Sequence, residues 1–300
     1  MGSWGTSLYS GDFAADLRRT VAVVARLPFD AERLLDLIIE VEHAAATNSE
    51  DEDHAIFWLV VADQLTLRGI HSPRAIDAAL AIIDSGRDLE MMARLGMSER
   101  DRAKRARQLA ELRARLVAPP SEPKPRSVLR RPQPYLFEAG EVLVFPTARG
   151  KCVNPYFSDK NRIPGGWQQD GWGAAVIVER GRAFDFLAWY RPLVTTSIER
   201  AKPDLDTIMS HRRWRIDWPG TVSRLHVKRM GIERAGLLTV DHAKLHARFP
   251  TLPSGRSTAV NDISIANRLR VAEVRPGVTP QRQLDNIVDS LSDLLGSDTI

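Results

Sequence analysis

Two histidines, His242 and His246, stand four residues apart, at the spacing that places both imidazoles on one face of a helix. A metal site of this kind needs at least one further ligand. The intervening sequence HAKLH lacks the glutamate of the HExxH pattern, and no third ligand is indicated nearby. The sequence therefore predicts neither a metal site nor a cofactor here.

The single cysteine, Cys152, is the other residue with specific chemistry. A nucleophilic thiol needs a neighbouring base and a lowered pKa, whereas the histidines that follow Cys152 are distant in sequence. We interpret Cys152 as a structural thiol. Because no GxSxG, P-loop or GxGxxG pattern occurs, the sequence favours a protein that is not an enzyme. A hydrolase or transferase assembled from scattered residues, such as Cys152 and a distant histidine, is the alternative.

Basic and aromatic residues gather in two stretches of the second half. Arginine can clamp carboxylates or phosphates through two hydrogen bonds, and tryptophan supplies flat apolar area, so both are favoured at interface anchors. The same combination can stack the bases of single-stranded nucleic acid. The alternative is that the tryptophans, Trp214 and Trp218 above all, fill a β core while the arginines face solvent. The predicted partner-binding residues are Lys151, Lys160, Arg162, Trp167, Trp172, Arg212, Arg213 and Arg215.

A proline-rich segment, Ala118–Pro134, separates these residues from the first half of the chain. Six of its seventeen residues are proline, which lacks the N–H that a helix or a ladder requires and disfavours helical conformation in the preceding residue. The segment is therefore predicted to be an extended spacer. The predicted organisation is a helical domain over 1–117, a basic linker over 118–134 and a mainly β domain over 135–300.

Length and composition fit two globular domains. The chain has 300 residues, of which 43% are hydrophobic and 27% charged, and this argues against wholesale disorder. No apolar run approaches the length of a membrane span, and the opening residues do not resemble a secretory signal. A lone cysteine fits a reducing compartment. We therefore expect a cytoplasmic protein with no membrane partner, and the oligomeric state is left open.

The net charge of +4 conceals an asymmetry. Residues 1–120 carry 15 basic and 19 acidic side chains, whereas residues 121–300 carry 27 and 19. A basic second half can dock on the acidic first half or meet an acidic partner, and the alternative is charge scattered over a solvated surface.

Before the spacer, apolar residues recur at helical spacing between residues that begin and end helices. Asp30 and Ser98 can cap helix starts, and Gly86 can end one. The pattern predicts an all-helical bundle of about five helices. Asp12 and Asp63 are interpreted as a cap and a surface residue.

After the spacer, short aromatic and β-branched runs alternate with glycine and proline. The segment 174–190 is predicted to be a hairpin that turns at Gly181. The predicted fold class is α+β: an N-terminal helical bundle followed by a mainly β domain, a curved sheet or small barrel, with a C-terminal helix. Further strands are predicted at 135–137, 141–145 and 225–230, and helices at 241–248 and 280–295.

The first half resembles a bacterial family. The opening MGSWGTSLYSGDFAADLRRTV and the segment beginning AIFWLVVADQLTLRG, followed by a basic helix and a proline-rich basic spacer, resemble the domain of unknown function 4259 family, whose members open Met-Gly-x-Trp-Gly. The resemblance covers roughly residues 1–132. It implies no reaction, because none is assigned to that family.

The second half resembles the immunity protein 26 family of bacterial toxin–antitoxin-like systems over residues 135–195. The matching stretches are GEVLVF at 140–145 and FDFLAWY at 184–190. Glu141 replaces the usual Asp, and residues 149–173 are an insertion relative to the family's pattern. The resemblance implies a protein that neutralises a toxin effector through protein–protein contact.

The leading hypothesis is therefore a non-enzymatic binding protein, an immunity protein with an acidic toxin effector as its partner. The second hypothesis is a nucleic-acid-binding module of a defence or regulatory system, which would use 151–172 and 211–229. Nucleic-acid binding should weaken steeply with added salt, because it releases counterions.

Overall fold

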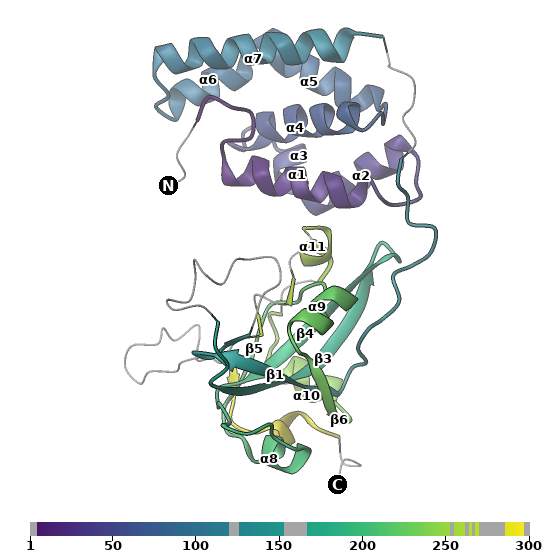
Figure 1. Ribbon diagram of the computed structural model, residues 1–300. Coiled ribbons are helices and arrows are strands. Elements are labelled where there is room, and N and C mark those ends of the chain that lie inside the picture. The colour runs from purple at the N-terminus through teal and green to yellow at the C-terminus, as the bar shows by residue number, and fades with distance from the viewer. Residues whose placement is uncertain are drawn as a thin grey trace. The chain divides into compact units, whose positions relative to one another are not determined.

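The chain folds into two compact units. The structure, a computed structural model, describes residues 5–119, 126–152, 167–252, 255–261, 264–265, 268–269 and 286–296. Contacts divide the chain into residues 1–131 and residues 132–300, and Figure 1 draws both units. No helix among the described residues combines the length and the hydropathy that crossing a membrane requires.

The first unit is a bundle with seven helices in its described part, where the periodicity predicts about five. Helix α4 (His54–Leu67) is buried around most of its circumference and packs against α1, α3, α5 and α7. The short helix α3 (His43–Thr47) has too few residues to show a period, so the sequence pattern misses it. The other helices are α1 (Asp12–Val24), α2 (Ala31–Val41), α5 (Pro73–Ser85), α6 (Arg87–Arg94) and α7 (Glu99–Val117).

The helix starts follow from capping residues. Asp30, Ser72 and Ser98 each accept a hydrogen bond from the backbone N–H three residues later, at distances of 2.8, 3.3 and 3.2 Å. Each bond satisfies a donor that has no partner within its helix. Gly86 ends α5 at φ +73°, a conformation that glycine adopts without a steric penalty.

Part of the predicted spacer contacts the first unit. The backbone N–H of Leu129 donates to the carbonyl of Arg26 at 2.7 Å, and Arg126 Nη2 donates to the carbonyl of Phe29 at 2.8 Å. The described residues of 118–134 form neither helix nor strand, as their prolines predict.

The second unit is built on an open antiparallel sheet, which confirms the α+β class. Its order is β2-β1-β3-β4-β5-β7, and β6 pairs with β1 beside β2. The strands are β1 (Glu141–Ala148), β2 (Lys151–Cys152), β3 (Gly171–Ala183), β4 (Leu187–Thr195), β5 (Trp214–Ile216), β6 (Glu233–Leu237) and β7 (Ile287–Val288). The helices are α8 (Leu205–Ser210), α9 (Arg224–Arg229), α10 (His242–Arg248), α11 (Gly255–Val260) and the 3-10 helix Leu291–Leu294.

Each face of this sheet carries its own apolar core. One core joins alternate residues of β1 and β3 to Leu245 of α10 and to Phe249 just after it, and surrounds Trp214. The opposite core joins the intervening residues to Tyr190, Met230 and Ile232. The two-residue alternation of a strand produces this division.

The predicted C-terminal helix over 280–295 is wrong in its described part. Residues 280–285 lie outside the described ranges, while Ile287 and Val288 pair with β5 and Leu291–Leu294 form a 3-10 turn. Two β-branched residues beside an unpaired sheet edge favour a strand there. Ser290 then caps the short turn by accepting the Ser292 N–H.

Two predicted strands and one predicted turn are also wrong. Residues 224–229 form α9, because Ser223 and His226 make a reciprocal capping box, and residues 135–137 are irregular. The hairpin turns at 184–186 rather than at Gly181. Gly181 lies opposite Trp189 within the ladder, where a Cβ would approach the indole ring to 2.5 Å.

Candidate functional site

One end of the sheet collects the turns of the second unit. Thr147 near the end of β1 pairs with Gly171 at the start of β3, and Thr195 at the end of β4 pairs with Trp214 at the start of β5. Trp214 in turn pairs with Val288 at the end of β7. Antiparallel pairing therefore places the turns after β1 and β4 and the turn before β5 at the same end of the sheet.

Basic side chains gather on these turns. Five of them are exposed, and none has an ion pair or a side-chain hydrogen bond within the described ranges. We call this surface the basic sheet end. Its residues are Arg149, Lys151, Arg200, Arg212 and Arg213.

The backbone holds the turn before β5 in place. Arg213 has φ +63°, which is rare for a large side chain and costs about 1–2 kcal/mol. Its N–H donates to the carbonyl of Asp289 at 2.9 Å, and Thr196 Oγ1 donates to the carbonyl of Arg213 at 2.9 Å. Contacts from two neighbouring segments thus maintain a conformation that arginine alone would not adopt, as is common where chains bind ligands.

The turn between β1 and β2 is similar. Arg149 and Gly150 have φ of +52° and +72° between the paired residues Ala148 and Lys151, as in a type I′ turn. Asp170 Oδ2 accepts the Arg149 N–H at 2.6 Å. The guanidinium of Arg149 is left to face solvent.

A buried histidine is hydrogen-bonded to one carboxylate of this region. His211 Nε2 lies 3.0 Å from Glu199 Oε1, and His211 Nδ1 lies 3.1 Å from Thr195 Oγ1. The order hydroxyl–imidazole–carboxylate is that of a nucleophile, a base and an orienting group. Because the Thr195 side chain is fully buried, substrate cannot reach it, and the set instead holds the Glu199 carboxylate against His211.

The predicted partner-binding residues have different placements. Lys151, Arg212 and Arg213 lie on the basic sheet end, whereas Arg215 is half-buried and pairs with Asp217 at 2.6 Å. Trp172 is half-buried beneath Lys202, whose Nζ lies 5.9 Å from the ring centroid. Trp167 is half-buried at the start of a described range. The predicted residues that fall outside the described ranges are Lys160 and Arg162.

Sequence reasoning missed two residues of this surface, Arg149 and Arg200. The dipeptide Arg149-Gly150 between two β-branched or aromatic runs is a turn signal that could have revealed the first. Of the two tryptophans weighed as core residues, Trp214 is fully buried and Trp218 is 52% exposed, because β5 ends at Ile216.

Cys152 lies buried in the core that contains Tyr190. Glu179, which nothing in the sequence connects with the histidine pair, brings a third ligand atom to within 4.8 Å of His242 and His246.

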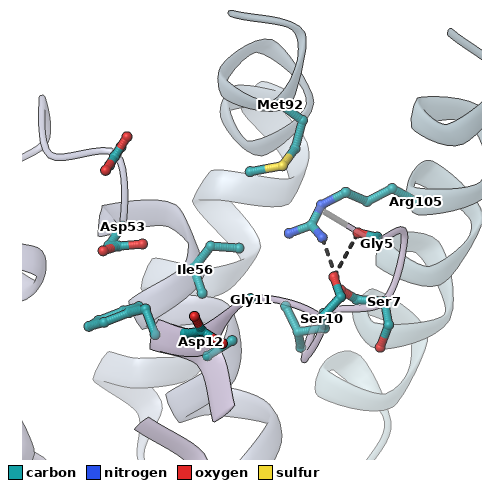
Figure 2. A pocket seen from close by; sticks show the side chains of 13 residues that line it. Gly5, Ser7, Ser10, Gly11, Asp12, Asp53, Ile56, Met92 and Arg105 are labelled. Atoms are coloured by element: carbon teal, nitrogen blue, oxygen red, sulfur yellow. Dashed lines mark hydrogen bonds between the residues drawn. The ribbon is translucent and has the colours of Figure 1, made fainter. Parts of the chain in front are cut away.

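The first unit contains a separate pocket. A cavity of about 170 Å³ lies between the N-terminal arm and the helices. Figure 2 shows Asp53 and Arg105 on opposite sides of it, with Ile56 and Met92 between them. Arg105 Nη1 lies 3.4 Å from the carbonyl of Ser7 and so reaches the arm.

Next to this pocket, Asp63 corrects a sequence-based interpretation. It is 3% exposed rather than a surface residue. Its carboxylate accepts hydrogen bonds from the Tyr9 hydroxyl and, at 2.5 Å, from Arg115 Nη2. Burial and the neighbouring Asp63 raise the pKa of Tyr9 well above its usual range. The contact docks the N-terminal arm on the helices.

Asp53, on the rim of the same pocket, provides a pH-dependent test. Burial, together with Asp51 and Glu52, raises the pKa of Asp53 to about 6, so the folded state disfavours its charged form. Stability from this group is lost as the pH rises from about 4 through 6. Asp53→Asn should therefore raise the melting temperature at pH 7.5, by a margin that shrinks to zero near pH 4.

Solvent screening limits the size of this effect to about 1 kcal/mol, because the Asp53 side chain is partly exposed. Differential scanning fluorimetry of both proteins across this pH range is the measurement. A difference in melting temperature that does not vary with pH would contradict the raised pKa of Asp53, because an effect of side-chain shape would be the same at every pH.

Comparison with known proteins gives no relative: the chain matches no family model, no curated protein sequence and no solved structure.

Proposed function

We propose that the protein is a non-enzymatic binding protein whose second unit recognises an acidic protein surface through the basic sheet end. The observation that carries the proposal is the set of five exposed basic side chains on fixed turns, with no acidic partner within the described ranges. Hydrogen bonds already hold the backbone of the turns at Arg149 and Arg213, so less backbone entropy is lost on binding. Guanidinium groups also pair with carboxylates through two hydrogen bonds.

A protein partner fits this surface better than nucleic acid. Binding of single strands relies on exposed aromatic platforms. At this end of the sheet Trp214 is buried and Trp172 lies against Lys202, while the exposed Trp218 follows the opposite end of β5. Ile198, which is 45% exposed and lies beside Gly171 at the start of β3, adds an exposed apolar side chain to the same end of the sheet. Apolar and arginine anchors within a polar rim are typical of protein interfaces.

This proposal agrees with the resemblance to the immunity protein 26 family, whose members neutralise toxins by contact. The partner would then be a toxin effector with an acidic active-site rim, and the basic sheet end would cover that rim. The proposal places the protein in the cytoplasm, where a lone buried cysteine stays reduced.

Reversing two charges tests the surface directly. Arg212→Glu/Arg213→Glu should weaken capture of an acidic protein from lysate of the source organism by at least about tenfold, because like charges then face each other. Arg224→Glu/Arg229→Glu on α9 makes the same charge change on exposed residues elsewhere in the unit and should retain capture. Quantitative mass spectrometry of the captured proteins measures both effects.

Three outcomes would count against the proposal. One is equal loss with both double variants, which would indicate a general charge effect. Another is recovery of nucleic acid alone. The third is tight, salt-sensitive binding of a labelled single-stranded oligonucleotide that Arg212→Glu/Arg213→Glu abolishes, which would identify nucleic acid as the partner. If an acidic protein is captured, growth rescue on co-expression tests whether it is a toxin.

A further inference from the structure

Three potential metal ligands converge on one face of the second unit, away from the basic sheet end. His242 and His246 lie one turn apart on α10, and Glu179 projects from β3. Their ligand atoms all lie within 4.8 Å of one another, and His246 Nε2 is 3.2 Å from Glu179 Oε1. Two imidazoles and a carboxylate form a donor set that suits zinc and the neighbouring divalent metals.

A β-bulge brings Glu179 to this face. Before the bulge, Ala175 and Ile177 point into the core around Tyr190, and Val178 points into the core that contains α10. The pairing with β4 then slips by one residue between Ile177 and Glu179. Without that slip, Glu179 would follow Ile177 to the opposite face, because strand residues alternate.

A buried arginine orients the carboxylate. Arg191 Nε lies 2.6 Å from Glu179 Oε2, and the Arg191 side chain is 3% exposed. This bond occupies one carboxylate oxygen, while the other lies next to His246. Carboxylate ligands are commonly held by such outer hydrogen bonds, which fix the ligand and tune the metal.

The histidines sit on a well-anchored helix. Leu245 is fully buried and Phe249 is 4% exposed in the core beneath α10, and Asp241 caps the helix by accepting the Lys244 N–H at 3.1 Å. Both imidazoles themselves face solvent, so ligation would require only a small change of side-chain rotamer. Figure 1 shows α10 beside the sheet.

We propose that Glu179, His242 and His246 form a binding site for a divalent transition metal, with Zn²⁺ as the reference ion. Three protein ligands leave a coordination position for water or for a ligand from another molecule, as in open zinc sites. This site is independent of the basic sheet end, so either proposal can fail without the other.

Isothermal titration of the full chain, treated with chelator and then dialysed, with ZnCl₂ tests the site. We expect one saturable equivalent of Zn²⁺, and His242→Ala and His246→Ala should each weaken its affinity by at least about tenfold. Excess Mg²⁺ should leave Zn²⁺ binding unchanged, because Mg²⁺ prefers oxygen ligands. Both substitutions lie at exposed positions of α10, so loss of folding is not expected and circular dichroism verifies it.

His71→Ala is the matched control, since His71 is an exposed histidine of the first unit. It should leave Zn²⁺ affinity unchanged. Absorption of the Co²⁺-loaded protein gives a second readout, because its d–d bands report coordination by nitrogen and oxygen at a fixed site. The proposal would be overturned by no saturable Zn²⁺ binding, by full affinity in His242→Ala, or by an equal loss in His71→Ala.

Discussion

Replacing Arg105 by alanine should lower the free energy of unfolding of the helical unit by about 3–5 kcal/mol. Arg105 Nε and Nη2 lie 2.6 and 2.7 Å from the two carboxylate oxygens of Asp88. The two side chains are 3% and 0% exposed. Arg105→Ala would therefore leave the Asp88 carboxylate buried without its counter-charge. Urea unfolding followed by circular dichroism at the helical band measures the loss.

A second arginine of α7 supplies the control. Arg113 pairs with Asp84 at 2.7 Å, but these side chains are 48% and 51% exposed. Arg113→Ala should leave the unfolding midpoint nearly unchanged, since water screens such pairs. Joint replacement by apolar residues, Arg105→Met with Asp88→Leu, should recover much of the stability lost in Arg105→Ala. Equal effects of Arg105→Ala and Arg113→Ala would contradict the role assigned to burial.

Gly140→Ala should destabilise the second unit by about 2–3 kcal/mol. Gly140 has φ +88°, and a Cβ there would lie 1.8 Å from the carbonyl oxygen of Leu238. The left-handed conformation alone costs about 1–2 kcal/mol for alanine. Relief of the clash would also break the 2.9 Å bond from the Leu238 N–H to the Gly140 carbonyl, which adds about 1 kcal/mol.

Tryptophan fluorescence during denaturant unfolding follows this change, because five of the seven tryptophans lie in residues 132–300. Gly86→Ala separates the cost of the backbone conformation from the cost of the clash, because Gly86 has φ +73° but open space where its Cβ would be. It should cost only the conformational term of about 1–2 kcal/mol. If Gly140→Ala and Gly86→Ala lower the free energy of unfolding equally, the clash with Leu238 contributes nothing to the effect of Gly140→Ala.

Local signals explain why the helical unit could be predicted from sequence. Asp30, Ser98 and Gly86 act within one turn of the helix ends that they define. The pairing of Asp88 with Arg105 could not be predicted, because charged residues are usually exposed. The burial of Asp63 escapes prediction for the same reason.

The strands of the sheet pair with segments that are distant in sequence, so the sheet is less completely predictable than the helices. Ile287 and Val288 fit a helical period, yet pairing with Trp214 and Arg215 makes them a strand. By contrast, α9 follows a local signal in the sequence, since Ser223 and His226 have the spacing of a capping box.

The residues of the candidate site also divide into those that the local sequence predicts and those whose position depends on distant contacts. Arg212 and Arg213 were expected to bind a partner and are exposed on a turn. The pairing of Arg215 with Asp217 was recognisable, because residues two apart share one face of a strand. Glu179 was not recognisable as a neighbour of His246, since its orientation depends on a bulge that no sequence pattern marks.

The pairing of β1 with β6 also bears on how the chain is made. Its first half pairs with β6, so the segment from Val144 to Glu233 must be synthesised before that ladder can close. The helical unit needs a shorter wait, because its helix pairs, such as α1 with α4 and α5 with α7, lie closer together in sequence than β1 and β6 do. Contacts between residues close in sequence form faster than distant ones, and domains generally fold in the order in which they leave the ribosome. A folded bundle would therefore precede an incomplete sheet, whose β1 edge stays open until β6 arrives.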